Sequence, residues 1–411
     1  MRAYGWLVAV VVAAAVAAVT AVAMMPPDGQ VIDPAPAAAT DYFTAAQIER
    51  GQDFRRPNFW IGLAALAAEL ALLVALTRRP PKWLGTSWWR GGLSGAAIAA
   101  GMSVVTLPFT IVLRIRSRDV GLNTRSWAGW AWDWTLSVAI NAVLMGLVAM
   151  ALLWLMRRLP RYWWVGGSVV VIVAATLWVL ISPVVLDPLF NRFTPLRQEP
   201  LRGEVLRLAR DAGVQVSEVQ VMDASKRTTG ANAYVAGLGA SKRIVIYDNL
   251  LNDFSHAEQL NIIAHELGHE HYKDVRNGLI YIAIVAPFGM FALALATRRF
   301  STGELGTPRT LPALALWLVL ISTGVTYISN SLSRQVEARA DSFALRETNA
   351  PDALIALQRR LVIRNVSDPE PPAWRTAVFG THPPPMDRIG MALTYRDRAA
   401  ARASTSWGLL R

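Results

Sequence analysis

The chain has 411 residues, a formal net charge of +12, no cysteine and 53% hydrophobic residues. Without cysteine it can form neither a disulfide nor a thiolate metal site, so any metal must be held by His, Asp or Glu. The positive charge could favour nucleic acid, but many Arg residues lie beside long apolar blocks, where basic residues flank membrane spans. We therefore expect a membrane protein with the lipid bilayer, and not nucleic acid, as a partner.

Seven apolar blocks approach or exceed the length of about 20 residues that a membrane-spanning helix needs. The first block could instead be a signal peptide, since Arg2 precedes an Ala/Val-rich stretch, but we expect its retention because it is longer than a signal core. Glu69 lies within the second block, and we expect it at a helix interface or beside a wet cavity. The blocks are approximately Tyr4–Met24, Phe59–Thr77, Gly92–Ile115, Trp134–Met156, Tyr162–Leu186, Gly278–Thr297 and Leu311–Asn330.

The polar region Asp187–Asn277, between the fifth and sixth blocks, is predicted to be α+β. Its periodicities indicate a helix, a strand, a hairpin around Gly-Leu-Gly-Ala and a second helix with Ser255 as its N-cap. These elements are Leu201–Ala212, Val214–Met222, Asn232–Gly237 with Lys242–Asp248, and Ser255–Asp274. A second polar region, Ser331–Arg411, follows the seventh block.

The second predicted helix contains His265-Glu266-Leu267-Gly268-His269, which fits the pattern H-E-x-x-H. Residues four apart lie about one turn, roughly 5.4 Å, along one helix face, so the two imidazoles can converge on one ion. Zinc accepts neutral histidine nitrogen, and the intervening Glu266 can take a proton from a zinc-bound water. Gly268 weakens the helix, which indicates that another element packs closely against this turn.

A catalytic zinc needs a third protein ligand, and a carboxylate is the natural candidate because no other His pair exists. Glu337 and Asp341 follow the seventh block and are four residues apart on a predicted helix. One of them can bind the metal while the other holds a liganding imidazole by a hydrogen bond. The alternative is a solvated helix face on which they pair with Arg334 or Arg339. Two spans separate them from the histidines, so both halves return to the same membrane face.

At this point the chain resembles peptidase family M48, in its CAAX prenyl protease 1 branch. The resemblance rests on His265–His269, on Ser333-Arg-x-x-Glu337-x-x-Ala-Asp341-x-x-Ala344, and on Thr381-His382-Pro-Pro-Pro-Met-Asp-Arg388-Ile389. The stretch Ile181–Asn191 is also similar to the family's entry into its catalytic region. The similarity extends over roughly residues 40–400.

The resemblance implies one Zn²⁺ per chain, held by His265, His269 and Glu337, with Glu266 as the base. It implies that Asp341 orients a ligand or donates a proton, and that His382 and Arg388 lie near the substrate. Asn232, Ala233 and Tyr234 resemble the edge strand along which zincin proteases bind a peptide backbone. The implied fold class is a mainly α membrane protein with about seven transmembrane helices and a zincin-like α+β metallopeptidase domain split around the last two spans.

The expected domains follow from these assignments. Residues 1–40 are an N-terminal span, or signal peptide, with a Pro/Ala-rich connector, and 41–190 are an N-terminal transmembrane helical domain. Residues 191–277 hold the first part of the peptidase domain, 278–330 the last two transmembrane helices, and 331–411 the second part with the third ligand and the His-Pro-Pro motif.

We therefore expect an integral-membrane zinc endopeptidase that acts on peptides or membrane proteins. The alternatives are a membrane signal transducer or scaffold with a metalloprotease-like domain, and a transporter or channel. The Ala/Val/Arg/Trp bias indicates a high-GC bacterium and its cell membrane, so we do not expect prenylated CaaX proteins as substrates. Basic loops after the second, fourth and sixth spans favour an external zinc site, whereas the resemblance implies a cytoplasmic one, which we prefer.

Overall fold

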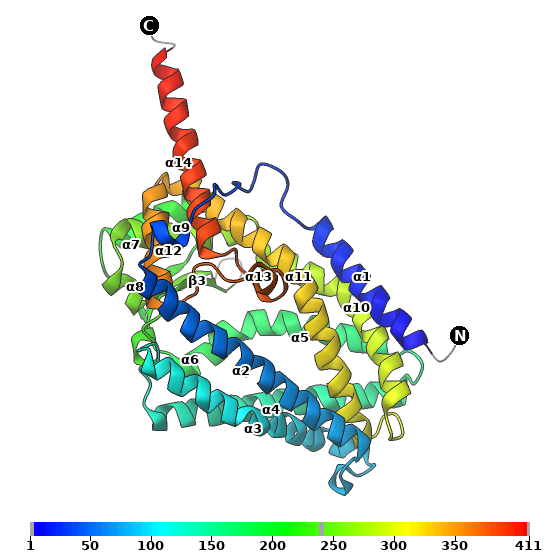
Figure 1. Ribbon diagram of the computed structural model, residues 1–411. Helices are drawn as coiled ribbons and strands as arrows, with labels where there is room; N and C mark the ends of the chain where they lie inside the picture. The colour runs from blue at the N-terminus through cyan, green and yellow to red at the C-terminus, as the bar shows by residue number, and fades with distance from the viewer. Residues whose placement is uncertain (1–3, 238–241, 409–411) are drawn as a thin grey trace.

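The structure is a computed structural model that describes residues 4–237 and 242–408 (Figure 1). Seven of its helical segments are long and apolar enough to cross a membrane, as the sequence predicts. They contain α1 (Gly5–Ala23), α2 (Ala45–Arg78), α3 (Gly91–Asp119), α4 (Trp127–Arg158), α5 (Trp163–Ile181), α10 (Asp274–Phe300) and α11 (Leu311–Thr348).

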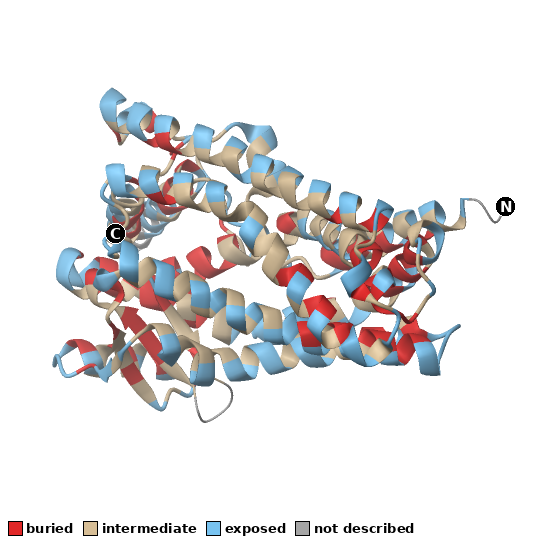
Figure 2. Cartoon of the chain, turned by 90° about the horizontal axis from the view of Figure 1, so that it is seen from below, coloured by how far each residue is buried: buried red, intermediate tan, exposed pale blue. Residues whose placement is uncertain are grey.

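Several spans extend beyond the predicted apolar blocks. Helix α2 begins fourteen residues before Phe59, because Thr44 caps it and exchanges hydrogen bonds with Gln47. Helix α5 continues through a π-helical turn, Ser182–Leu186, into the short helix α6 (Asp187–Phe190). Apolar side chains such as Val11, Trp60 and Val143 remain more than 60% exposed on the outer faces, as expected for lipid contact. Figure 2 shows that exposed positions recur along the long helices.

The polar regions form an α+β unit at one end of the helical bundle (Figure 1). Its four-stranded sheet has the order β1-β2-β4-β3, in which only the pair β2 and β4 is parallel. Strands β3 and β4 form the predicted hairpin, but residues 238–241 of its turn lie outside the described part of the chain. The strands are β1 (Phe193–Pro195), β2 (Glu218–Met222), β3 (Ala233–Ala236) and β4 (Arg243–Tyr247).

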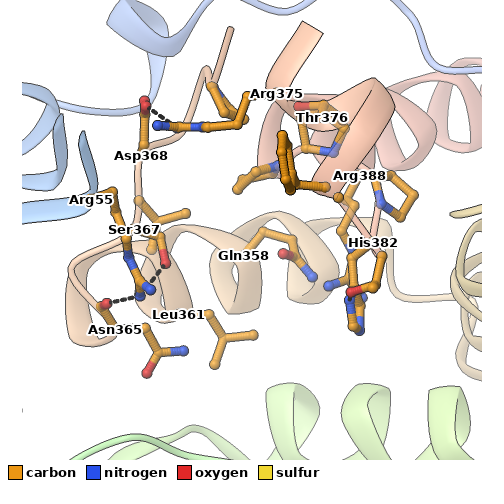
Figure 3. Close-up of a pocket in the computed structure, with 18 of the residues that line it drawn as sticks. Arg55, Gln358, Leu361, Asn365, Ser367, Asp368, Arg375, Thr376, His382 and Arg388 are labelled. Carbon is orange, nitrogen blue, oxygen red and sulfur yellow. Dashed lines mark hydrogen bonds and ion pairs between the residues drawn. The ribbon is translucent and has the colours of Figure 1, made fainter. Parts of the chain in front are cut away.

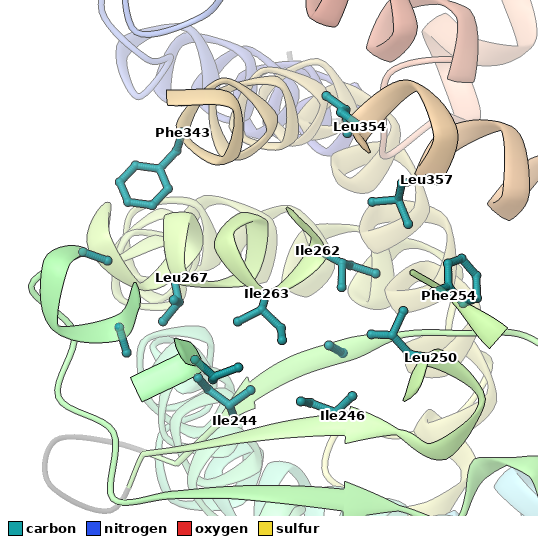
Figure 4. Close-up of a cluster of buried hydrophobic side chains, with 14 of the residues drawn as sticks. Ile244, Ile246, Leu250, Phe254, Ile262, Ile263, Leu267, Phe343, Leu354 and Leu357 are labelled. Carbon is teal, nitrogen blue, oxygen red and sulfur yellow. The ribbon is translucent and has the colours of Figure 1, made fainter. Parts of the chain in front are cut away.

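Six further helices complete this unit. They are α7 (Leu201–Asp211), α8 (Asp248–Asp253), α9 (His256–His271), α12 (Pro351–Arg364), α13 (Ala373–Phe379) and α14 (Pro385–Gly408). Strand β2 is shorter than the predicted strand Val214–Met222, because its pairing with β4 begins only at Glu218. The apolar core lies between the sheet, α9, α11 and α12, and Figure 4 shows Ile244, Ile246 and Leu267 packed within it.

Helix α9 is the element that carries the H-E-x-x-H motif. Ser255 caps it, and its hydroxyl and backbone exchange hydrogen bonds with Glu258, which confirms the predicted N-terminus. The helix ends at His271, three residues before the predicted end, because Lys273 takes a left-handed conformation with φ 59°. Helix α10 then leaves towards the membrane from Asp274.

Helix α11 returns from the membrane and continues without a break for 38 residues into the α+β unit. Its first part is a membrane span, and its last turns carry Glu337 and Asp341. The connector between α1 and α2 crosses this same region, where the backbone N–H of Ile32 donates to the Ser342 hydroxyl at 2.9 Å.

Candidate metal centre

His265 and His269 lie on one face of α9, with their Nε2 atoms 3.2 Å apart. Each Nδ1 faces a carboxylate: His265 contacts Asp341 Oδ1 at 2.9 Å, and His269 contacts Asp274 Oδ2 at 3.0 Å. An Nδ1–H that donates to a carboxylate leaves Nε2 with its lone pair. Both imidazoles are thereby oriented to present Nε2 to a common ion.

Glu337 approaches this pair from α11. Its Oε2 lies 3.3 Å from Nε2 of His265, and its Oε1 lies 3.7 Å from Nε2 of His269. One ligand atom from each of the three residues lies within 4.8 Å of the others. Oε2 is buried without a hydrogen-bond partner of suitable geometry among the described residues. Buried polar atoms are rarely left unsatisfied, and a cation here would complete this one.

Asp341 joins the His265 imidazole to Arg388. It is fully buried, and Arg388 donates to both of its oxygens, from Nε at 2.6 Å and from Nη2 at 2.5 Å. A buried carboxylate needs such charge compensation. Asp341 therefore lies where the sequence-based interpretation put an orienting residue, and Arg388 acts on the site through it.

Asp274 was not identified from the sequence. Its Oδ2 faces His269, while Arg339 donates to its Oδ1 and lies 4.1 Å over the ring of Tyr272. Arg339 therefore pairs with Asp274, and not with Glu337 or Asp341 as a solvated helix face would require. The sequence did contain a signal, a carboxylate five residues after His269. Because the predicted helix extended to Asp274, the turn that brings this carboxylate back to His269 was not expected.

Glu266 lies between the two histidines on α9. Burial raises the pKa of its carboxyl, and the neighbouring imidazoles and Arg388 act in the opposite direction. A carboxyl with a raised pKa accepts a proton more readily than an ordinary glutamate near neutral pH.

His382 reaches the centre from the loop before α14. Its Nε2 lies 3.2 Å from Glu337 Oε2, on a side chain that is 57% exposed, and its Nδ1 contacts the Thr381 hydroxyl at 2.9 Å. An exposed imidazole beside a predicted ligand can reach a bound substrate.

Strand β3 lies at the edge of the sheet, next to α9. Asn232 precedes it, exposes its side chain and accepts a hydrogen bond from the backbone N–H of Tyr247. Ala233 is buried in the core, and the Tyr234 hydroxyl donates to Asp187 at 3.3 Å. The structure thus brings all the predicted metal and catalytic residues together and leaves one backbone edge of β3 unpaired among the described strands.

This arrangement, a multi-pass helical membrane protein with a His-His-Glu centre, defines an integral-membrane metallopeptidase. Two family models match adjacent parts of the chain: the CAAX prenyl protease N-terminal domain with five membrane helices over residues 32–192, and peptidase family M48 over residues 195–396. The chain belongs to peptidase family M48 and is a metalloendopeptidase of the CAAX prenyl protease 1 type.

Relatives and a solved structure agree with this assignment. An uncharacterized metalloprotease, YhfN, of Bacillus subtilis (strain 168) is 32% identical over 70% of this chain and 69% of its own length. A CAAX prenyl protease 1 homolog of Arabidopsis thaliana is 28% identical over 72% of this chain and 71% of its own. The crystal structure of Ste24p from S. mikatae has the same fold, with a TM-score of 0.73 over 95% of this chain and 97% of that one, at 20% identity. The transducer and transporter hypotheses find no comparable support.

Proposed function

We propose that this protein is a zinc-dependent endopeptidase in which His265, His269 and Glu337 hold the metal and Glu266 is the general base. The observation that carries this proposal is the geometry of the donor atoms. Ligand atoms on a tetrahedral zinc, each about 2.0–2.1 Å from it, lie about 3.3 Å apart. The two Nε2 atoms lie 3.2 Å apart, close to that value. Glu337 brings one carboxylate oxygen to each imidazole, Oε2 at 3.3 Å from His265 Nε2 and Oε1 at 3.7 Å from His269 Nε2.

Zinc in this position would supply a Lewis acid that lowers the pKa of a water molecule and polarises the scissile carbonyl. Glu266 takes the proton of the attacking water and passes it to the leaving amine. Asp341 and Asp274 hold the two imidazoles in the orientation that leaves Nε2 free, and Arg388 compensates the charge of Asp341. His382 donates a hydrogen bond to the oxyanion that develops on the substrate carbonyl.

The backbone of Asn232, Ala233 and Tyr234 binds the substrate as an added strand. Pairing through backbone groups fixes an extended peptide beside the centre without reading its side chains. The α+β unit, formed from the described parts of residues 191–277 and 331–411, is the peptidase domain. Helices α10 and α11 divide it in the sequence and join it to the bundle. The substrates are peptides or membrane proteins.

The proposal is tested with Glu266→Gln in the full chain purified in detergent. Loss of the base should lower kcat for peptide cleavage by about 10²–10⁴-fold, while the zinc content stays equal to that of the wild type. Glu270→Gln is the matched control, because Glu270 lies one turn further along α9 and pairs with Lys242 instead of facing the centre. Undiminished cleavage by the purified Glu266→Gln protein would refute the mechanism.

A further inference from the structure

A cavity of about 640 Å³ opens beside the metal centre, between α2, α12, α13 and the loop that carries His382 (Figure 3). It shares two residues, His382 and Arg388, with the centre and extends away from it as far as Arg55 on α2. Its volume is within the range of ligand pockets in proteins. We propose that this cavity is a substrate subsite in which Gln358 donates a hydrogen bond to a backbone carbonyl of the bound peptide. This inference rests on the proposed function.

Gln358 is the residue whose unsatisfied amide indicates that the cavity binds a ligand. It lies on α12 and is only 3% exposed, yet its Nε2 has no hydrogen-bond partner among the described residues. Figure 3 shows its amide directed towards His382 and Arg388, which also line the cavity. A buried donor without a partner destabilises the folded protein, and binding of an acceptor satisfies it. A peptide that passes the centre supplies such an acceptor in each of its carbonyls.

The cations of the cavity wall are already engaged, which argues against an anion as the occupant. Arg388 is paired with Asp341, and Arg375 donates to Asp368 at 2.7 Å. Arg55 donates to the backbone carbonyls of residues 365 and 366, at 2.5 and 3.0 Å. These side chains shape the wall, and the unsatisfied donor is the neutral amide of Gln358.

Part of the wall is apolar and aromatic, between polar side chains such as Asn58, Ser367 and Thr376. Phe59 and Phe379 lie edge to face with ring centroids 5.0 Å apart, and Leu361 and Val362 continue the surface along α12. A peptide carbonyl therefore fits the Gln358 amide, and an apolar side chain beside it fits the aromatic and aliphatic surface. This combination assigns the subsite to an extended peptide segment with an apolar residue at this position.

Gln358→Leu tests the subsite, because leucine keeps much of the side-chain volume and removes the donor. For a long peptide with an apolar residue in the subsite, KM should rise about tenfold, which corresponds to the loss of one hydrogen bond, with little change in kcat. Peptides can then be shortened residue by residue from either end. The difference in KM between Gln358→Leu and wild type should disappear once the peptide is too short to reach the cavity. The melting temperature should stay the same or rise, since an unsatisfied buried donor is removed.

A binding measurement separates this inference from the proposed mechanism. Anisotropy of a fluorescently labelled peptide on Glu266→Gln, with and without Gln358→Leu, reads the subsite without any cleavage. Gln215→Leu is the matched control, since Gln215 is exposed outside the cavity. Equal peptide affinity with and without the Gln358 amide would overturn the inference. A lower melting temperature of the Gln358→Leu protein, together with the same loss of affinity for peptides of every length, would overturn it too. Competition by inorganic phosphate would also overturn it, by showing an anion site instead.

Discussion

Two carboxylates outside the proposed ligand set orient the imidazoles that would hold the metal. Asp341 holds His265 and Asp274 holds His269, and each carboxylate is in turn paired with an arginine, Arg388 or Arg339. Such outer partners fix the tautomer and the direction of a liganding histidine. We therefore expect metal affinity in this protein to depend on residues that do not touch the ion.

Asp341→Asn should weaken metal binding by about 10–100-fold, because the amide no longer accepts the Nδ1–H as a charged group. It should also lower the melting temperature, since Arg388 is left buried without its carboxylate, at a cost of about 3–5 kcal/mol. Competition with a chelator measures the affinity. Asp352→Asn is the control, because Asp352 also pairs with an arginine, Arg396, but is mostly exposed. An unchanged metal affinity for Asp341→Asn would contradict this role.

Metal binding should strengthen as pH rises. Burial alone would lower the pKa of His265, but the charge of Asp341, the hydrogen bond to Asp341 and the nearby Glu337 carboxylate raise it to about 10. The metal-free imidazole therefore carries a proton at neutral pH, and the proton must leave before Nε2 can bind. Affinity should rise by up to about tenfold per pH unit below this pKa. Isothermal titration in buffers of different ionisation enthalpy counts the released protons, and a count of zero at pH 7 would be inconsistent with this charge state.

At the scale of the elements, the centre depends on how closely α9 and α11 approach each other. A Cβ atom on Gly268 would lie 3.2 Å from Phe343 Cβ and 3.3 Å from the Cα of Ala340. The sequence predicts a close neighbour at this turn, and the structure identifies it as α11. Since α9 carries the histidines and α11 carries Glu337, the distance between these helices fixes the distance between the ligands.

Gly268→Ala should push α11 away by a few tenths of an ångström and weaken metal binding by about tenfold, comparable to the loss of an outer partner. Helix propensity alone would predict the opposite, a stabilisation of about 1 kcal/mol. Gly278→Ala on α10 is the control, because no atom lies within 4 Å of the added methyl group. Chelator competition measures the metal affinity and so distinguishes displacement of α11 from the gain in helix propensity. Stronger or equal metal binding by Gly268→Ala would show that α11 accommodates the methyl group without displacing Glu337.

At the scale of the whole molecule, the loops opposite the α+β unit gather at one end of the bundle with the first turns of α1 (Figure 1). The Thr302 hydroxyl donates to the Thr77 carbonyl, Arg298 donates to the Pro160 carbonyl, and Trp6 contacts Phe300. These loops carry ten basic residues and a single acid, Glu304. The basic residues are Arg78, Arg79, Lys82, Arg90, Arg157, Arg158, Arg161, Arg298, Arg299 and Arg309.

Arginines on the side of the α+β unit also bond within the protein. Arg116 donates to Asn58 at 2.6 Å, and Arg55 holds the loop after α12. The positive-inside rule then predicts that the basic end is cytoplasmic and that the centre faces the other side of the membrane, contrary to what the family resemblance implies. If the basic end is cytoplasmic, alkaline phosphatase fused after Arg411 should be active, because α14 extends outward from the α+β unit, on the same side as the metal centre (Figure 1). An inactive phosphatase with a fluorescent green fluorescent protein fusion would place the centre in the cytoplasm.

Local chemistry made much of this protein predictable from its sequence. Seven apolar blocks are spans because the bilayer leaves few other solutions, and Ser255 begins a helix that puts His265 and His269 on one face. The expectation of a carboxylate as third ligand followed from the absence of cysteine and of a second His pair, and the family resemblance implied Glu337 and not Asp341. These inferences need only contacts within one helix or strand. The placement of the histidines and Glu337 on the same membrane face needs only an even number of spans between them.

Contacts between elements distant in the sequence were decided only by the tertiary structure. The hydrogen bond of Asp341 to His265 spans 76 residues, and the pairing of Arg339 with Asp274 spans 65. The approach of α11 to Gly268 and the cavity around Gln358 likewise arise where separate helices pack. The periodicity of a sequence shows which face of an element is buried, but it does not show which face meets which, because that depends on the packing of the whole chain.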